Sequence, residues 1–244
     1  MDRGLPSLSV GCTHGWSRAN RQLLMRLYGI LDSQSELNLM THILHLDASP
    51  RGDRSISRML SKEFINQWKT THPNDTITYR DIGHYPVPFV SEDWIAAAFT
   101  LSDQHTPELA AAIQISDELI DEFLSADRYV FGIPMYNLSI PANFKAYLDQ
   151  IVRAGRTFSV DETGYKGLVH NRKMTIIMAQ GGAYPEGSPT HAYDLQTPYL
   201  KLIFGFIGIT DIEFVYADSL NMGDEARNLA IANAQSALRA AIAR

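Results

Sequence analysis

Residues 40–60 read MTHILHLDASPRGDRSISRML, and this stretch decides the fold. It opens on a largely apolar run, His42 to Leu46, of the length and composition of a buried β-strand. From Ser55 to about Trp68, apolar residues recur at three- and four-residue steps, which predicts a helix. A strand, a short loop and a helix in this order begin a β-α-β unit, so the stretch predicts a parallel sheet.

The same alternation continues along the chain. Further strands are predicted at 76–82, 128–133, 174–178 and 212–216, and further helices begin near Trp94, Thr106, Pro141, Thr197 and Asp224. Residues 156–169 contain two short strand-like pieces around Gly164 and predict a hairpin or flap. Five strand-helix repeats predict an α/β domain whose sheet carries helices on both faces.

The loop between the first strand and the first helix is rich in groups that bind phosphate. It contains three serines and two arginines, and the helix that follows adds free N–H groups and the positive end of its dipole. The loop therefore predicts a phosphate site, at the sheet edge where such domains bind ligands. The alternative is that these serines only cap the helix. The candidate phosphate-binding residues are Ser49, Ser55, Ile56 and Ser57.

Several other sites are excluded by missing motifs. No G-x-G-x-x-G or G-x-x-x-x-G-K-[ST] is present, which disfavours a dinucleotide fingerprint and excludes a P-loop, so one terminal phosphate, as on FMN, fits best. No G-x-S-x-G is present, and Pro134 stands where a receiver domain would carry its aspartate. The eight histidines form no metal pattern: His42 and His45, three apart on a strand, point to opposite faces.

The loops after the third and fourth strands can hold a flat aromatic ring. After the third strand, Met135, Tyr136 and Leu138 can form apolar walls, and Asn137 can present backbone groups to a polar ring edge. After the fourth strand, Ala179, Gln180, Gly181 and Gly182 let backbone approach a ligand, and N–H groups there could stabilise negative charge on a reduced flavin. Ordinary core packing and a plain Gly-Gly turn are the alternatives.

Bulk properties narrow the class of protein. The formal net charge of −6 argues against nucleic acid or an anionic membrane as a partner. A lone cysteine, Cys12, cannot form an intrachain disulfide, and no apolar run is long enough to cross a bilayer, so we expect a cytoplasmic protein. Residues 1–39 differ from the rest and are predicted to be an N-terminal extension mostly outside the fold, with a targeting piece or an added helix as the alternatives. Residues 40–244 are predicted to form the domain.

The motifs resemble those of the FMN-dependent NADH-azoreductases, relatives of the NAD(P)H quinone reductases. The resemblance runs from Met40 to the C-terminus and is carried by Ser49, Ser55-Ile56-Ser57, Pro134-Met135-Tyr136-Asn137, Gly181-Gly182, Phe144-Lys145-Tyr147-Asp149, Arg153-Ala154-Gly155-Thr157-Phe158, Thr197-Pro198-Tyr199-Leu200 and Phe204-Gly205-Phe206-Ile207-Gly208. It implies a flavodoxin-like three-layer sandwich with strand order 2-1-3-4-5, a homodimer, and one FMN per subunit near the interface. The family often has an aromatic residue at Leu138 and a Ser-Arg pair at Ala179-Gln180.

The resemblance also implies a function. NADH or NADPH would reduce the flavin, and a quinone or azo compound would then take the electrons on the same ring face, with ping-pong kinetics. The flavin carries the chemistry, so no catalytic side chain is predicted. Phe158 and Tyr184 could frame the acceptor pocket or simply pack. A flavodoxin-type electron carrier without a nicotinamide site is the main alternative, and a flavin-free protein of this fold is a third.

Overall fold

The computed structural model describes residues 40–243 of the chain. Its main sheet is built from five parallel strands in the spatial order β2-β1-β3-β6-β7. With the hairpin strands left out of the numbering, this is the predicted order 2-1-3-4-5. The strands are β1 (His42–Asp47), β2 (Thr76–Asp81), β3 (Arg128–Pro134), β6 (Lys173–Ala179) and β7 (Asp211–Ala217).

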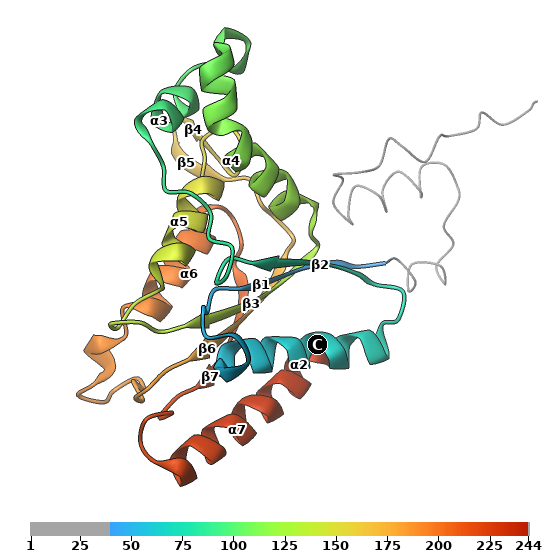
Figure 1. Cartoon of the computed structure of the whole chain (residues 1–244), viewed down its shortest axis with the longest axis vertical. Helices are drawn as coiled ribbons and strands as arrows, with labels where there is room; N and C mark the ends of the chain where they lie inside the picture. Colours follow the sequence, from blue (N-terminus) through green and yellow to red (C-terminus); the bar gives the residue numbers. More distant parts are fainter. Residues whose placement is uncertain (1–39, 244) are drawn as a thin grey trace, which may run out of the picture.

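Helices cover both faces of the sheet, as the alternation predicted. In Figure 1, α2 and α7 lie on one face, and α4, α5 and α6 lie on the other. Each face has its own buried apolar cluster, one around Phe64 and Trp68 of α2, the other around Phe123 of α4 and Phe144 of α5. The helices are α2 (Ile56–Thr71), α4 (Pro107–Ser125), α5 (Ala142–Ile151), α6 (Gln196–Phe206) and α7 (Asp224–Ile242).

Two helices begin earlier than the sequence predicted, because polar side chains cap them. Helix α3 (Glu92–Ala98) begins after Ser91, whose hydroxyl accepts a hydrogen bond from the Trp94 N–H at 3.1 Å. Helix α6 begins at Gln196, because the Asp194 carboxylate accepts from the N–H groups of Gln196 and Thr197. The predicted starts near Trp94 and Thr197 are therefore late by one or two residues, an ordinary error at helix boundaries.

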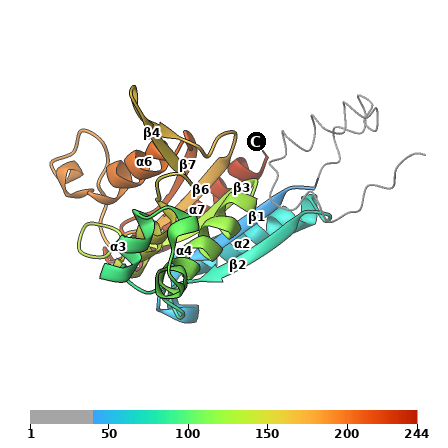
Figure 2. The ribbon, with the colours of Figure 1, turned by 90° about the horizontal axis from the view of Figure 1, so that it is seen from above.

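The predicted hairpin is present. Strands β4 (Phe158–Asp161) and β5 (Gly164–Gly167) pair antiparallel and project beyond the main sheet beside α6 (Figure 2). Gly167 allows this contact, since a Cβ there would lie 2.3 Å from the Gly208 nitrogen. Between residues 40 and 243, three short 3-10 turns were not predicted, at Gly52–Arg54, Ser102–Gln104 and His191–Tyr193.

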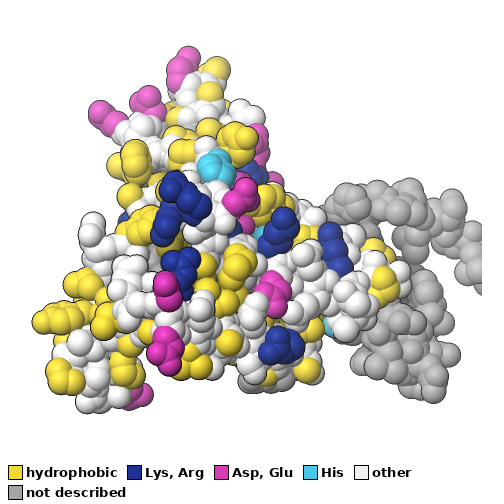
Figure 3. Space-filling view, turned by 60° about the horizontal axis from the view of Figure 1, so that its bottom comes forward, with side chains coloured by type: hydrophobic (Ala, Val, Ile, Leu, Met, Phe, Trp, Pro, Cys, Tyr) yellow, Lys and Arg dark blue, Asp and Glu magenta, His cyan; other side chains and the backbone are white. Residues whose placement is uncertain are grey.

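The surface of the described residues mixes side-chain types. On the face drawn in Figure 3, basic, acidic and apolar side chains are interspersed, and no single charge dominates it. None of the helices described between residues 40 and 243 is long and apolar enough to cross a bilayer. The predictions about residues 1–39, Cys12 among them, lie outside the described residues.

Candidate active site

The loops after β1, β3 and β6 meet at the carboxyl edge of the sheet, as predicted. They enclose a cavity of about 210 Å³ together with the loop after β7. Strands β1, β3 and β6 are neighbours in the sheet, so their carboxyl ends lie at the same edge. The lining residues are Ser49, Arg51, Ser55, Ile56, Pro134, Met135, Tyr136, Ala179, Gln180, Gly181, Leu220 and Asn221.

The serine loop is held rigidly between β1 and α2. Ser55 caps α2: its Oγ accepts from the Arg58 N–H at 3.3 Å and lies 3.2 Å from the Ser57 hydroxyl. The Arg51 N–H donates to Ser49 Oγ at 3.3 Å, which closes the loop on itself. The first N–H groups of α2 have no partner within the helix, so the cavity meets a set of donors at a positive helix end.

The loop after β3 makes a tight turn in an uncommon conformation. Tyr136 and Ser139 exchange two backbone hydrogen bonds, of 3.0 and 3.1 Å, across Asn137 and Leu138. Both central residues have positive φ, +49° and +72°, as a type I′ turn requires. Asn tolerates this conformation, but a leucine there is strained, and the Leu138 carbonyl is fixed by the Leu195 N–H at 3.1 Å. The turn therefore gives Tyr136 one defined position at the cavity.

The loop after β6 is pinned by the loop after β7. The carbonyls of Gln180, Gly181 and Gly182 accept from the N–H groups of Leu220, Asn221 and Ser219, at 3.1, 3.0 and 3.2 Å. A Cβ on Gly181 would lie 2.5 Å from Asn221 Nδ2, so any other residue here would have to displace the Asn221 side chain. The Gln180 N–H donates to the Ala217 carbonyl at 2.8 Å, so the donors that this loop offers a ligand are the N–H groups of Gly181 and Gly182 and the side-chain amide of Gln180.

Most of the predicted site residues line this cavity, and the rest lie beside it. The lining includes eight of them: Ser49, Ser55, Ile56, Met135, Tyr136, Ala179, Gln180 and Gly181. Ser57 lies behind Ser55 and is fully buried, while Asn137, Leu138 and Gly182 belong to the same turns without lining the cavity. Arg51 and Pro134 also line the cavity; the sequence analysis placed both in these loops without naming them as site residues. Sequence reasoning missed Leu220 and Asn221, which follow β7, although the rule that ligands lie beyond strand ends pointed there too.

The two predicted acceptor residues have different surroundings. Tyr184 lines a second cavity, of about 470 Å³, which also contains Gln180 and so adjoins the first. The ring of Phe158 instead packs against Phe206 and Tyr165, with centroids 4.8 and 6.1 Å away. Within one chain, Phe158 therefore lies outside both cavities, and its role in acceptor binding stays a prediction.

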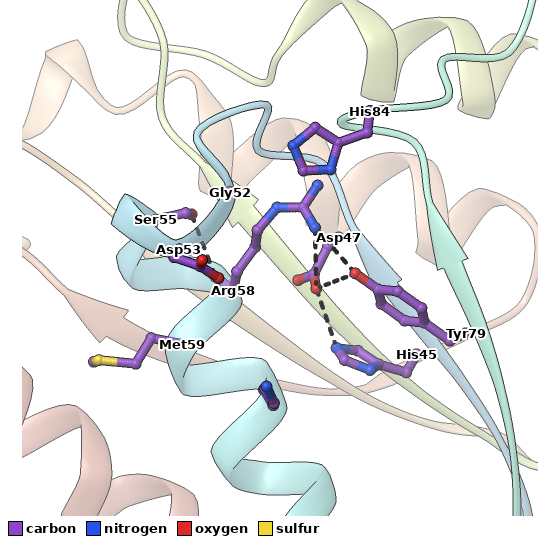
Figure 4. A pocket seen from close by; sticks show the side chains of 10 residues that line it. His45, Asp47, Gly52, Asp53, Ser55, Arg58, Met59, Tyr79 and His84 are labelled. Atoms are coloured by element: carbon purple, nitrogen blue, oxygen red, sulfur yellow. Dashed lines mark hydrogen bonds and ion pairs between the residues drawn. The ribbon is translucent and has the colours of Figure 1, made fainter.

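A third cavity, of about 490 Å³, lies behind the serine loop and shares Ser55 with the first. Figure 4 shows its side chains converging from β1, β2 and α2. His45 Nε2 lies 3.5 Å from Asp47 Oδ2. Burial, followed by the charge of Arg58, lowers the pKa of His45 to about 4, so its imidazole is neutral at neutral pH and the contact is no salt bridge. Burial also raises the pKa of Asp47 to about 6, against the hydrogen bond from Ser61 and the charge of Arg58.

The pKa shifts of Asp47 and His45 give the free energy of unfolding opposite dependences on pH. Asp47 binds its proton more tightly in the folded chain, so its contribution falls as pH rises from about 4 to 6. His45 binds its proton more tightly in the unfolded chain, so its contribution rises with pH from about 4 to 6.5. Each contribution is on the order of 3 kcal/mol, and the two oppose each other over the same pH range in the native protein.

In Asp47→Asn, the pH dependence of stability that comes from His45 is therefore expected to appear on its own. Relative to the native protein, the variant should gain stability as pH rises from 4 to 6, by on the order of 3 kcal/mol. Urea unfolding of both apoproteins at several pH values gives this difference directly. His45→Gln should give the opposite slope, and superimposable pH profiles for the native protein and Asp47→Asn would contradict the assignment.

Comparison with known proteins identifies the family of the chain. Residues 41–242 match the model of a family described by its flavodoxin-like fold. An FMN-dependent NADH:quinone oxidoreductase from Trichormus variabilis is 64% identical over 205 residues, which cover 84% of this chain and 99% of that relative.

Two solved structures from Bacillus anthracis are also similar. An azoreductase has 32% identity and a TM-score of 0.77, covering 84% of this chain and all of that one (100%). An FMN-dependent NADH-azoreductase solved in complex with FMN has 29% identity and a TM-score of 0.75, covering 83% and 100%. With a matching family model, a curated relative of such identity and a cavity at the expected strand ends, the chain belongs to the flavodoxin-like family of FMN-dependent NADH:quinone oxidoreductases and azoreductases.

Proposed function

We propose that this protein is an FMN-dependent oxidoreductase that takes electrons from NADH and passes them to quinones or azo compounds. The observation that carries the proposal is the convergence of the serine loop, the Tyr136 turn and the Gly181 loop on one cavity. Close relatives bear the name FMN-dependent NADH:quinone oxidoreductase, and similar structures are azoreductases.

The serine loop would hold the FMN phosphate. Ser49 and Ser55 line the cavity with their hydroxyls close to the start of α2, and Arg51 at the same wall is exposed. A phosphate there would accept charge-assisted hydrogen bonds from hydroxyls and N–H groups, each worth roughly 1.5–3 kcal/mol. Ser57, whose hydroxyl lies 3.2 Å from Ser55 Oγ, would orient that hydroxyl rather than contact the phosphate.

The Tyr136 and Gly181 loops would hold the isoalloxazine ring. Met135 and Tyr136, with Leu138 and Asn137 in the same turn, would supply apolar walls and backbone groups. Ala179, Gln180, Gly181 and Gly182 would lie along the pyrimidine edge, with the N–H groups of Gly181 and Gly182 and the side-chain amide of Gln180 as the donors. Gln180 fits this task, because it is 2% exposed and its Nε2 has no hydrogen-bond partner. A buried donor without a partner costs free energy, which a flavin oxygen would recover.

One ring face would stay open for substrates. The cavity of about 210 Å³ lies below the roughly 300–1,000 Å³ of pockets that enclose whole ligands, so FMN would be only partly covered. When bound, FMN accepts hydride from NADH and supplies electrons to the acceptor. The protein's part is to position the ring, and Tyr184 in the adjoining cavity would border the acceptor. Phe158 lines neither of these two cavities, so it would border the acceptor from the partner subunit of a dimer.

The proposed function predicts a reaction whose two steps, reduction of the flavin and its reoxidation, can be observed separately. The FMN-loaded protein should bleach on addition of NADH without air and regain its colour on addition of a quinone. Double-reciprocal plots of the steady-state rate against one substrate, at several fixed concentrations of the other, should be parallel lines, because the two substrates use the same ring face in turn. Persistent flavin colour with NADH would favour a flavodoxin-type carrier, and a protein that binds no FMN would contradict the proposal.

We also propose that the protein acts as a homodimer. Several large apolar side chains between β2 and α4 are exposed, among them Phe89 at 75%, Phe99 at 86% and Leu101 at 67%. Apolar side chains grouped in this way are typical of interfaces. Sedimentation of the FMN-loaded protein should give twice the chain mass of 27.3 kDa, and a monomer at micromolar concentration would contradict the proposal.

A cytoplasmic location and a lack of nucleic-acid and membrane partners are part of the same proposal. The net charge of −6 and the single cysteine support it. The assignment of residues 1–39 to an extension and of 40–244 to the domain stays a prediction. Detection of the protein in a membrane or extracellular fraction would contradict the location.

A further inference from the structure

Arg58 reaches back from the first turn of α2 to the loop that precedes the helix. Its side chain is only 11% exposed. The Nε donates to the Ser49 carbonyl at 2.6 Å, and the same residue's backbone N–H donates to Ser55 Oγ at 3.3 Å. One residue thus holds both serines that line the 210 Å³ cavity, Ser49 through its side chain and Ser55 through its backbone.

The other end of the Arg58 guanidinium is anchored to the last residues of β2. Both of its Nη atoms donate to the Asp81 carboxylate. Nη1 also donates to the Tyr79 hydroxyl at 3.0 Å, and Figure 4 shows Arg58 and Tyr79 facing each other. Asp81 is itself fixed by the N–H groups of Gly83 and His84, each at 3.1 Å. Burial raises the pKa of Asp81, but the hydrogen bonds from Arg58 and His84 outweigh it and lower that pKa overall.

The two loops touch directly at Gly83. A Cβ on Gly83 would lie 2.2 Å from the Ser49 carbonyl oxygen and 2.4 Å from Arg58 Nη2. Such a contact with backbone is open only to glycine. The Ser49 carbonyl is therefore enclosed between Gly83 and Arg58. Asp81 is connected to the serine loop through Arg58 by direct hydrogen bonds.

The charge of Arg58 is already compensated by the protein. Asp81 binds it directly, and Asp47 Oδ2 lies 3.9 Å from Nη1. Arg51 and Arg54 in the same loop are instead exposed, and Arg51 lines the cavity. A buried arginine paired with carboxylates has little charge left for an outside anion, so Arg58 differs in role from Arg51.

We propose that Arg58 is a positioning residue for the flavin phosphate: by tying the Ser49 carbonyl to Asp81 it sets the spacing of the two cavity serines. The inference rests on the proposed function, since it concerns the phosphate of the proposed cofactor. The phosphate donors converge only while the strand end and the helix start keep this spacing. Loss of the tie lets the loop relax, which weakens binding of the phosphate and leaves the ring contacts at Tyr136 and Gly181 unchanged.

The test compares FMN with riboflavin, which carries the same ring and no phosphate. Affinities of both flavins for the full chain are measured by fluorescence titration of the apoprotein. In Arg58→Lys and Arg58→Gln, the preference for FMN over riboflavin should drop by roughly tenfold or more, about the loss of one charge-assisted hydrogen bond, while riboflavin affinity stays unchanged. Asp81→Asn, which keeps Arg58 and weakens its anchor, should give the same selective loss in smaller measure and covers the case that the Arg58 variants fold poorly.

Arg80→Gln is the matched control. Arg80 precedes Asp81 and makes a two-pronged pair with Glu122, at 3.0 and 2.7 Å, with no contact to the serine loop. It should lower stability without changing the flavin preference. An unchanged preference in the Arg58 and Asp81 variants would overturn the inference, as would an equal loss of both flavins. A native protein that binds FMN and riboflavin equally would instead reject the proposed phosphate site itself, and this inference with it.

Discussion

Ser55→Ala combined with Ser57→Ala is expected to weaken FMN binding by roughly a hundredfold. Ser55 Oγ lies at the cavity and Ser57 Oγ lies 3.2 Å from it. Loss of one or two hydrogen bonds to a charged phosphate, at roughly 1.5–3 kcal/mol each, gives a change of this size. Most of the loss should come from Ser55, because Ser57 does not line the cavity. Fluorescence titration of the two single variants and the double variant measures each share.

The control for this prediction separates phosphate binding from helix capping. Ser55 also caps α2, so its replacement should cost about 0.5–2 kcal/mol of stability. Thr106→Ala removes the equivalent cap of α4, where the Thr106 hydroxyl accepts from the Leu109 N–H at 3.4 Å. Thr106 lies far from the serine loop in the chain. It should show a similar loss of stability with FMN affinity intact. Native FMN affinity in the serine double variant would reject the phosphate assignment.

Gly132→Ala is expected to disturb the fold and the site together. A Cβ at this position of β3 would lie 2.4 Å from Asp47 Oδ1, 3.1 Å from the Ser57 carbonyl and 3.2 Å from Ser61 Oγ. The first turn of α2 must then move away from the sheet and take the serines with it. Overpacking of this kind costs typically about 1–3 kcal/mol, which lowers the melting temperature by roughly 2–12 °C in a domain of this size.

FMN affinity should fall in the same variant, because the helix start carries the phosphate donors. Differential scanning calorimetry and fluorescence titration measure the two effects. Gly205→Ala in α6 is the matched control: a Cβ there meets nothing within 4 Å, and alanine in a helix is favoured by roughly 0.5–1 kcal/mol. It should melt slightly higher and bind FMN normally. A Gly132→Ala protein with native melting and FMN affinity would show that α2 does not need this close approach.

The fold could be predicted because local patterns and topology agree. Strand β3 is buried along its whole length and reads as an apolar run, while Thr106-Pro107 marks the start of α4. Once five strands alternate with helices, the handedness of the crossovers leaves few arrangements. Because ligands bind beyond the carboxyl ends of parallel strands, the sequence predicted that Ser49, Tyr136 and Gly181 lie close together. All three line the same cavity.

The parts that sequence reasoning missed depend on contacts between distant residues. The pairing of Arg58 with Asp81 joins residues 23 positions apart, and neither position carries a motif. The loop after β7 closes the cavity through backbone hydrogen bonds to Gln180 and Gly181, which any sequence could make. Phe158 lies on the hairpin as predicted, but its direction is set by Phe206 and Tyr165, and that packing has no local signal.

The central claim is that the cavity between the Ser55, Tyr136 and Gly181 loops holds FMN. A crystal structure of the FMN-loaded protein tests it most directly. The account predicts phosphate density within hydrogen-bond distance of Ser55 Oγ and the ring against Tyr136 and Gly181. FMN bound elsewhere, or a phosphate remote from the serine loop in a protein that still oxidises NADH, would contradict it.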